Sequence, residues 1–340
     1  MTVLITGGAG FIGSTIASAC ADRGHEVIVL DDLSTGVAAF ADRHRFYRGD
    51  IADGALLDRI VRENPDIDIV VHCAAKIVVP DSVADPLGYF DANVARTVSL
   101  LTNLTRNGLD RVVFSSSAAI YDTPVDGVVH EGSPVAPPSP YADTKAVVER
   151  VLQAGATAGS LRAVALRYFN PIGADPSLRT GLQSPTPSHA LGKLISARRD
   201  GGRFTITGTD WPTRDGSGVR DYVHVWDLAE AHALVVDRFD EVVGALRPFR
   251  ALNLGTGRGT TVLELVEAFG RVTGQAPRVE LAGRRPGDTA GAFADVSAAR
   301  DLLGWEARLS VDEGIADALR WADVARRSGL FDHASAPVAH

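Results

Sequence analysis

The chain has 340 residues, of which 45% are hydrophobic and 22% are charged, and its formal net charge at pH 7 is −8. This composition predicts a globular protein with a large core and two lobes, and the acidic excess argues against nucleic acid or an anionic membrane surface as a partner. No apolar run approaches the roughly 20 residues of a membrane span, the chain enters its first strand at once, and both cysteines lie in apolar surroundings, so we expect a cytoplasmic protein.

Short apolar runs alternate with helical patterns through the first half of the chain. This alternation is typical of βα units, in which parallel strands form one sheet and helices cover both faces. Ligands of such sheets bind at the carboxyl ends of the strands. We therefore predict an α/β fold with a doubly wound parallel sheet. The predicted strands are residues 3–6, 27–30, 45–47, 67–72, 111–115 and 163–168, and the predicted helices include residues 86–106 and 141–154.

The character of the chain changes after Tyr168. Residues 170–188 hold several prolines and glycines and predict a shaped loop. Helices at 189–199, 225–239, 261–273 and 311–327 and a strand at 251–254 follow. We expect a smaller mixed α/β lobe that closes over the cleft, with some segments returning to the sheet. The predicted boundaries are a first domain at 1–172, a second lobe at 173–327 and a mobile tail at 328–340.

A glycine-rich turn follows the first predicted strand and opens a helical pattern. Its glycines, Gly7, Gly10 and Gly13, permit a tight turn and close approach of the backbone to a pyrophosphate, whose charge the helix N-terminus favours. The second predicted strand ends at Asp31, where a carboxylate is expected to bind the adenosine ribose hydroxyls. Because an acid there repels a 2′-phosphate, and no arginine follows at once, the sequence predicts NAD rather than NADP.

Tyr141 and Lys145 lie four residues apart in a predicted helix, so their side chains project from one face. An ammonium one turn away favours the phenolate and lowers the pKa of a tyrosine that otherwise ionises near pH 10. Upstream, Ser117 follows the predicted strand 111–115 and can hydrogen-bond a substrate hydroxyl. Beside an NAD site, this trio predicts proton removal from a carbinol oxygen during hydride transfer.

The glycine pattern, Ser117 and the pair Tyr141 and Lys145 together resemble the extended short-chain dehydrogenases/reductases. Further segments are similar to the UDP-glucose (UDP-galactose) 4-epimerase branch, and the resemblance covers residues 2–321. These segments are Leu30-Asp-Asp-Leu-Ser34, Gly49-Asp-Ile51, Val71-His-Cys-Ala-Ala75, Ser115-Ser-Ser-Ala118, Arg167-Tyr-Phe-Asn-Pro171, Gly218-Val-Arg-Asp-Tyr-Val-His-Val225 and Arg285-Pro-Gly-Asp288.

The resemblance implies a Rossmann-type sheet, a tightly held NAD, and 4-epimerisation of a UDP-hexose. In that reaction Tyr141 takes the proton of the sugar O4 while the C4 hydride leaves. The resulting 4-keto sugar turns its other face and takes the hydride back. The resemblance also implies a homodimer formed through the helices at 86–106 and 141–154.

Roles for further residues follow from the same motifs. Asp31 would hold the adenosine ribose, Asp50 and Ile51 would flank the adenine, and Tyr168 would lie near the nicotinamide. The predicted cofactor contacts are Gly7, Gly10, Phe11, Ile12, Gly13, Asp31, Asp32, Ser34, Thr35, Gly36, Asp50, Ile51, Ala74, Ala75, Asn93, Tyr141, Lys145 and Tyr168. The predicted substrate contacts are Lys76, Ser117, Tyr141, Asn170, Arg179, His189, Leu191, Thr205, Arg220, Arg285 and Asp288, of which Asn170, Arg220, Arg285 and Asp288 would hold the UDP moiety.

Three departures from the family pattern leave the sugar open. His189-Ala-Leu191 stands in place of an Asn-Asn-Leu run, and His189 is better interpreted as a capping or packing residue than as a catalyst. Gly291-Ala292 replaces a bulkier side chain, which predicts room for an N-acetyl or carboxylate substituent. Lys76-Ile-Val-Val-Pro80 replaces a glycine-rich loop. Lys76 or Arg179 could pair with a uronate carboxylate, and a solvated surface position is the alternative for both.

Competing functions differ in the residues that they require. A nucleotide-sugar dehydratase needs an Asp-Glu pair after the hydroxyl residue, where this chain has Ala118 and Ala119, and decarboxylation of UDP-glucuronate is disfavoured similarly. A non-enzymatic NAD sensor would not need Tyr141 and Lys145. Among epimerases, UDP-glucose, UDP-N-acetylhexosamine and UDP-glucuronate all remain candidate substrates.

Overall fold

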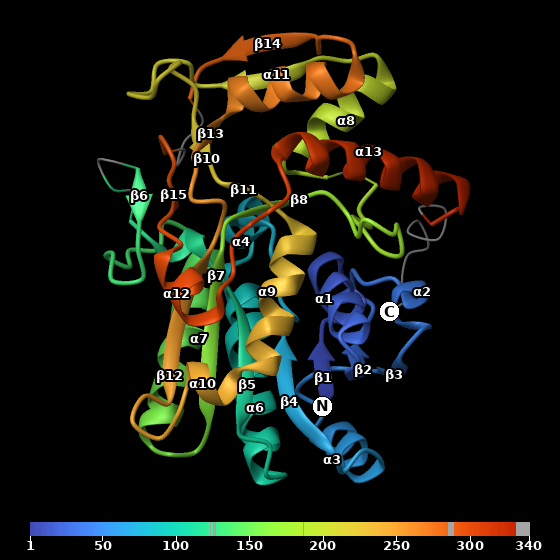
Figure 1. Ribbon diagram of the computed structural model, residues 1–340, viewed down its shortest axis with the longest axis vertical. Coiled ribbons are helices and arrows are strands. Elements are labelled where there is room, and N and C mark those ends of the chain that lie inside the picture. The colour runs from blue at the N-terminus through green and yellow to red at the C-terminus, as the bar shows by residue number, and fades with distance from the viewer. Residues whose placement is uncertain (123, 125–126, 186, 285–288, 331–340) are drawn as a thin grey trace.

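The computed structural model describes residues 1–122, 124, 127–185, 187–284 and 289–330. Its centre is a parallel sheet of seven strands in the order β12-β7-β5-β4-β1-β2-β3 (Figure 1). Because the chain turns in opposite directions on the two sides of β1, the sheet is doubly wound, and the predicted fold class is confirmed. The strands are β1 (Thr2–Thr6), β2 (Glu26–Asp31), β3 (Arg45–Arg48), β4 (Ile67–His72), β5 (Arg111–Ser117), β7 (Arg162–Tyr168) and β12 (Phe249–Leu254).

Both faces of the sheet are buried, which explains the unbroken apolar runs in its strands. Alternate residues point to opposite faces, so Val3 and Ile5 pack with helices α1 (Phe11–Asp22) and α9 (Val225–Asp237), which lie side by side in Figure 1. On the other face Leu4 packs with α3 (Gly54–Glu63) and α6 (Arg96–Arg106), and Phe114 packs with α6 and α7 (Pro140–Thr157). Two helical layers therefore fix the positions of the strand ends.

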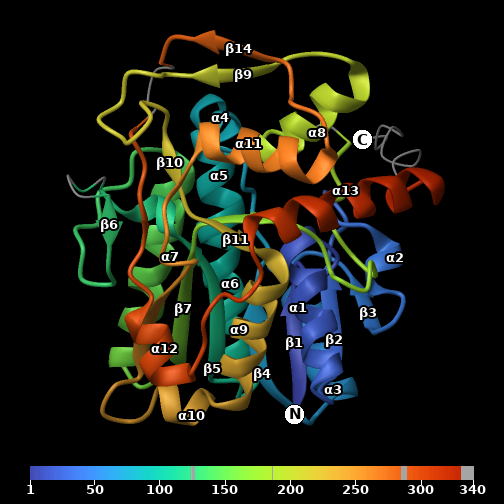
Figure 2. The same cartoon turned by 45° about the horizontal axis from the view of Figure 1, so that its top comes forward.

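Most of the remaining elements gather beyond the carboxyl ends of the strands (Figure 2). Their core joins α8 (Ala190–Asp200), α11 (Val262–Thr273) and α13 (Val311–Arg327). Four two-stranded sheets pair β8 (Asn170–Ile172) with β11 (Tyr222–His224), β9 (Phe204–Thr207) with β14 (Val279–Ala282), β10 (Val219–Arg220) with β13 (Thr260–Thr261), and β6 (Val128–Val129) with β15 (Phe293–Ala294). Shorter helices are α2 (Ala38–Ala41), α4 (Val79–Ala84), α5 (Pro86–Phe90), α10 (Phe239–Val242) and α12 (Ser297–Leu303).

Most of the predicted elements are present, with shifted ends. The expected helix 86–106 consists of α5, a π-helical turn at Asp91–Ala95 and α6. The helix expected at 225–239 ends at Asp237, and α10 follows it. As expected, one late segment returns to the main sheet, because β12 pairs with β7. Of the expected mobile tail, residues 331–340 lie outside the described residues, whereas Leu330 packs beside Trp321.

Candidate active site

In the glycine turn after β1, two of the three motif glycines have no room for a side chain. Gly7 has φ of 71°, a conformation that favours glycine, and a Cβ there would lie 2.6 Å from the backbone N of Ala74. A Cβ on Gly13 would lie 2.2 Å from the carbonyl oxygen of Gly7. A Cβ on Gly10 would lie 3.4 Å from its nearest neighbour, the carbonyl oxygen of Gly7, so this position is less crowded than the other two. The turn therefore fits the predicted pyrophosphate cradle.

Asp31 ends β2 with its carboxylate held by the backbone. One oxygen accepts a hydrogen bond of 3.0 Å from the amide of Ala9, and the other accepts one of 2.8 Å from the amide of Leu33. Burial raises the pKa of this carboxyl, while both amides oppose the rise. A Cβ on Gly36 would lie 2.7 Å from the same carboxylate, so Gly36 allows the following loop to pass close to it. This geometry suits the predicted contact with ribose hydroxyls.

Asp50 and Ile51 lie just after β3, at the same edge of the sheet. Ile51 is buried. Asp50 accepts a hydrogen bond from the amide of Ala52 and forms an ion pair with Arg96 at 2.5 Å. Arg96 begins α6 and also pairs with Asp91. Sequence reasoning did not single out Arg96, because nothing in its spacing shows that α6 reaches the β3 loop.

Ser117, Tyr141 and Lys145 come together at the carboxyl end of β5. Ser117 is the last residue of that strand, and α7 begins at Pro140 behind an N-cap in which Ser139 accepts from the amide of Ala142. All three side chains are buried. Lys145 donates a hydrogen bond of 2.9 Å to the carbonyl oxygen of Ser115 and lies over the ring of Phe114. The trio predicted from sequence is therefore one cluster.

The electrostatics of the cluster differ from the expectation in one respect. Burial raises the pKa of Tyr141, whereas a hydrogen bond with Ser117 lowers it, and burial is the larger effect. Burial also lowers the pKa of Lys145 to about 8, and Cys73 and Glu149 oppose that shift. The expected lowering of the pKa of Tyr141 by Lys145 is not found: desolvation of the phenolate dominates, and Lys145 is not among the groups that shift this pKa.

Glu149 continues the face of α7 that bears Tyr141 and Lys145, and sequence reasoning missed it. Its carboxylate accepts two hydrogen bonds, at 3.0 and 3.1 Å, from the Nε of Arg167 on β7 and one from the hydroxyl of Ser116. Burial on both sides makes this a costly pair to break. The spacing of four residues after Lys145 is the signal that could have identified Glu149.

Asn93 fixes the loop that begins at Lys76. Its side chain lies in the π-helical turn, where it accepts from the amide of Lys76 at 2.8 Å and donates to the carbonyl of Lys76 at 2.9 Å. It also donates to the hydroxyl of Thr144 on α7. The ammonium of Lys76 is half-exposed and lies 3.7 Å from Asp85. Asn93 is therefore a buried residue that connects this loop to α7. The contact expected between the Lys76 ammonium and the sugar stays a prediction.

The predicted substrate contacts come from several elements of the second group. His189 caps α8 by accepting from the amide of Gly192, as the sequence interpretation held, and burial lowers its pKa to about 4. His189 and Leu191 line a cavity of about 260 Å³ together with Phe11, which places predicted cofactor and substrate residues around one space. The other predicted substrate contacts lie on different elements. Asn170 is exposed at the start of β8, Thr205 on β9 hydrogen-bonds Glu280, and Arg220 ends β10. Arg285 and Asp288 lie outside the described residues.

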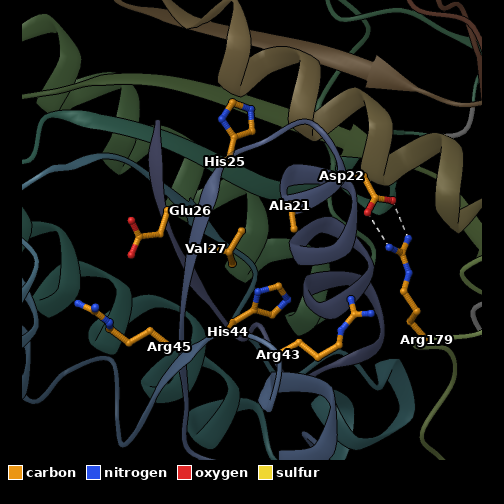
Figure 3. A pocket seen from close by; sticks show the side chains of 9 residues that line it. All are labelled: Ala21, Asp22, His25, Glu26, Val27, Arg43, His44, Arg45 and Arg179. Carbon is orange, nitrogen blue, oxygen red and sulfur yellow. Dashed lines mark hydrogen bonds and ion pairs between the residues drawn. The ribbon is translucent and has the colours of Figure 1, made fainter.

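Arg179 lies away from this cavity, which corrects the expectation that it meets the sugar. It forms ion pairs with Asp22, at 2.7 Å, and with Asp175, and its guanidinium lies over the ring of Trp226. Figure 3 shows Arg179 joined to Asp22 at the wall of a separate pocket beside α1. Asp22 ends α1 and so lies toward the opposite edge of the sheet from Asp31. Two carboxylates already neutralise Arg179 there.

Known proteins share this architecture over almost the whole chain. A UDP-glucose 4-epimerase of Bacillus subtilis is 40% identical, across 94% of this chain and 96% of the relative. Another, of Azospirillum brasilense, is 41% identical across 94% and 91%. The solved UDP-glucose 4-epimerase of Stenotrophomonas maltophila, with bound NAD and formylated UDP-arabinopyranose, is 37% identical with a TM-score of 0.92, and the similarity covers 96% of this chain and 99% of that one.

In the described residues no helix is long and apolar enough to cross a membrane.

A family model described as the NAD dependent epimerase/dehydratase family matches residues 3–255. The matched segment includes the glycine turn, Asp31 and the cluster of Ser117, Tyr141 and Lys145. The chain belongs to the NAD-dependent epimerase/dehydratase family.

Proposed function

We propose that this protein is an NAD-dependent 4-epimerase of a UDP-hexose, which makes it an isomerase. The observation that supports this most strongly is the buried trio of Ser117, Tyr141 and Lys145 beside the glycine cradle and Asp31. Relatives named UDP-glucose 4-epimerase are about 40% identical to this chain over nearly their whole length. Solved relatives contain NAD, and one also contains UDP.

Tyr141 is the group that moves the proton of the sugar O4. Its phenol takes the proton as C4 is oxidised and returns it as C4 is reduced, so the protein ends each cycle unchanged. Ser117 hydrogen-bonds the phenol, which stabilises the phenolate and orients it. Lys145, anchored to the carbonyl of Ser115, would supply a positive charge one helical turn from Tyr141, whose pKa burial raises. NAD, when bound, would supply the acceptor for the C4 hydride and the donor that gives it back.

The cofactor contacts assigned to this chain are proposals that the geometry favours. Gly10 would leave room for the pyrophosphate, and Asp31 would bind the adenosine ribose while the two amides hold it in place. Ile51 would pack on the adenine, and Tyr168 would face the nicotinamide. The buried carboxylate of Asp31 has no cationic partner within the described residues, so a 2′-phosphate would meet uncompensated charge.

The second lobe, which we propose to be residues 173–327, would hold the UDP moiety. Asn170 and Arg220 project from elements at its base, and the cavity lined by His189 and Leu191 adjoins the cofactor side at Phe11. Arginine suits a diphosphate because its planar fork forms paired charge-assisted hydrogen bonds. The remaining residues assigned to this contact, Arg285 and Asp288, stay predictions from the motif.

Epimerisation is favoured over dehydration by the residues after Ser117. Ala118 and Ala119 form a short 3₁₀ turn there, and neither can act as an acid or a base. Dehydration of a nucleotide sugar requires proton transfer at C5 and C6 as well as at O4. With Tyr141 assigned as the proton-transfer group at this strand end, the site supports reversible oxidation at a single carbon.

The choice of hexose is proposed from the small residues on the sugar side and from the name of one solved relative. Gly291 and Ala292 give the sugar side little bulk, and a Cβ on Gly291 would lie 1.8 Å from the carbonyl of Val219, so this position holds no larger residue in the present backbone. A Campylobacter jejuni relative, 33% identical with a TM-score of 0.80, is a UDP-Glc/GlcNAc 4-epimerase. We propose UDP-glucose and UDP-galactose as the principal pair, with UDP-N-acetylhexosamine and UDP-glucuronate as alternatives.

A homodimer is proposed through the helices around α7. Exposed apolar side chains gather on α4, α5 and α6, where Val83 is 65%, Leu87 is 82% and Val98 is 39% exposed. Such side chains are expected to be covered by a second copy. Light scattering of the wild type and of Leu87→Asp tests the dimer, since the introduced charge should prevent association and give monomers.

A cytoplasmic location is proposed because Cys20 and Cys73 are both free thiols.

The experiment that tests the function is a substrate panel. Purified protein is incubated separately with UDP-glucose, UDP-N-acetylglucosamine and UDP-glucuronate, and the C4 epimers are separated by chromatography. We expect UDP-galactose from the first, in a reaction that needs no added reductant or oxidant. The absence of any C4 epimer from all three substrates would contradict the proposal.

A further inference from the structure

Two tyrosines face the same end of the sheet, and only one can be the proton-transfer group. Tyr168 ends β7 directly beside Ser117 at the end of β5. Burial raises the pKa of Tyr168 well above 10, and the neighbouring Tyr141 raises it further. Tyr168 therefore keeps its proton throughout the pH range of catalysis. The O–H of Tyr168 is therefore a hydrogen-bond donor, and its direction depends on the acceptors around it.

A buried chain of hydrogen bonds lies behind this phenol. The hydroxyl of Ser115 bonds Tyr168 and lies 3.1 Å from the Nε2 of His232 and 3.2 Å from the Sγ of Cys73. The Nδ1 of His232 lies 2.7 Å from the carbonyl oxygen of Leu228, one turn earlier on α9. His232 is 0% exposed and Ser115 is 1% exposed.

The partners fix the direction of every bond in the chain. A carbonyl oxygen can only accept, so the Nδ1 of His232 carries a proton and donates to Leu228. Burial lowers the pKa of His232 to about 4, so the ring is neutral and its Nε2 must accept. Ser115 has one proton, which it donates to that Nε2. Tyr168 and Cys73 can then bond Ser115 only by donating to its oxygen.

We propose that His232 and Ser115 are positioning residues that commit the proton of Tyr168 to the protein interior and so present its phenol oxygen to the cofactor as an acceptor. This inference rests on the proposed function, because it assigns the accepting oxygen to the carboxamide N–H of the nicotinamide. Tyr141 and Tyr168 thereby have different tasks: the first exchanges a proton, and the second only accepts a hydrogen bond. The same strand end also anchors Lys145 through the carbonyl of Ser115.

The direct test is the tautomer of His232 in the wild-type protein with its bound cofactor. In ¹⁵N-labelled protein at pH 7, long-range imidazole correlations should show a neutral ring protonated at Nδ1, and His232→Gln identifies the resonances. A ring protonated at Nε2, or at both nitrogens, would overturn the proposal. This readout does not depend on turnover, so it holds its meaning even if no UDP-sugar is epimerised.

A double-mutant cycle tests the link to Tyr168. His232→Phe and Tyr168→Phe should each lower the NAD retained after gel filtration and reduce kcat by roughly fivefold, the value of one neutral hydrogen bond. The double variant should lose no more than either single one, because both changes remove the same contact. Additive losses in the cycle would overturn the proposal.

His232→Gln separates positioning from support of the fold. Its side-chain oxygen can take the place of Nε2 as the acceptor for Ser115, so NAD retention and kcat should return to within about twofold of the wild type, within the spread of one hydrogen bond. A merely structural role predicts instead that Gln and Phe lower stability alike and raise the KM for the UDP-sugar together with a fall in kcat. That pattern would overturn the proposal.

Discussion

Lys145 donates its hydrogen bond of 2.9 Å to the carbonyl oxygen of Ser115. The ammonium is thereby tied to β5, two residues before Ser117, which is the last residue of that strand. Because β5 holds the ammonium at this contact, its charge is fixed on the side of α7 that also bears Tyr141, one helical turn away. The base is thus set by the sheet as much as by the helical spacing of Tyr141 and Lys145.

Tyr141→Phe should abolish proton transfer while leaving the cofactor site intact. We expect turnover to fall by about 10³-fold or more, within the upper range for loss of a general acid–base group. The content of bound NAD should stay close to that of the wild type. Tyr47→Phe is the matched control, because Tyr47 lies on the edge strand β3 and bonds Glu63. Steady-state kinetics decide the matter, and substantial activity in Tyr141→Phe would remove Tyr141 from its role.

Lys145 should make stability depend on pH in a defined direction. Its pKa falls from 10.5 to about 8 on folding, so the unfolded chain binds more protons between these values and stability rises with pH there. The contribution is at most about 3 kcal/mol, from roughly 1.4 kcal/mol per pKa unit. Lys145→Met should lack this gain. Urea unfolding of both proteins at pH 7 and pH 10 measures it, and equal pH dependence would show that the pKa of Lys145 is not depressed.

Gly10 and Gly13 should respond differently to the same substitution. A Cβ at position 13 would lie 2.2 Å from the carbonyl oxygen of Gly7, so Gly13→Ala should lower the melting temperature of the protein stripped of cofactor. At position 10 the nearest atom is 3.4 Å away, so Gly10→Ala should fold normally but retain much less NAD. Calorimetry and dinucleotide analysis separate the two effects. Equal loss of stability in both variants would contradict the assignment of the space beside Gly10 to a ligand.

Asp31 should set the choice of dinucleotide. Asp31→Asn keeps an acceptor for one backbone amide but removes the charge, so we expect weaker binding of NAD and a smaller preference for NAD over NADP. Asp42→Asn is the control, because this exposed carboxylate follows α2 and is not among the predicted cofactor contacts. Dinucleotide extracted from the purified proteins gives the ratio. An unchanged ratio in Asp31→Asn would be inconsistent with ribose recognition by Asp31.

The sequence predicted the parts of the fold that depend on local order. Alternating apolar runs located the strands of the main sheet, and glycine spacing located the turn before α1. Features that depend on distant segments were not accessible. Arg179 sits in a proline- and glycine-rich loop whose path beside α1 brings it to Asp22, 157 residues away in the chain, and no spacing reveals that contact.

The candidate site shows the same division. Tyr141 and Lys145 were recognisable from helical spacing, because both lie on one face of α7. The balance of their electrostatics was not, since the pKa of Tyr141 depends on how deeply the surrounding elements bury it. The hydrogen bonds of Ser115 with His232, 117 residues apart, likewise arise only when α9 packs on the sheet.

The most direct measurement of the central claim follows the hydrogen at C4 of the sugar. UDP-galactose deuterated at C4 is incubated with the purified protein in ordinary water, and the UDP-glucose formed is analysed by mass spectrometry and NMR. Reversible oxidation with Tyr141 as the proton-transfer group predicts UDP-glucose that keeps deuterium at C4, with no net release of reduced cofactor. Deuterium exchanged for solvent hydrogen, or no UDP-glucose at all, would contradict the account.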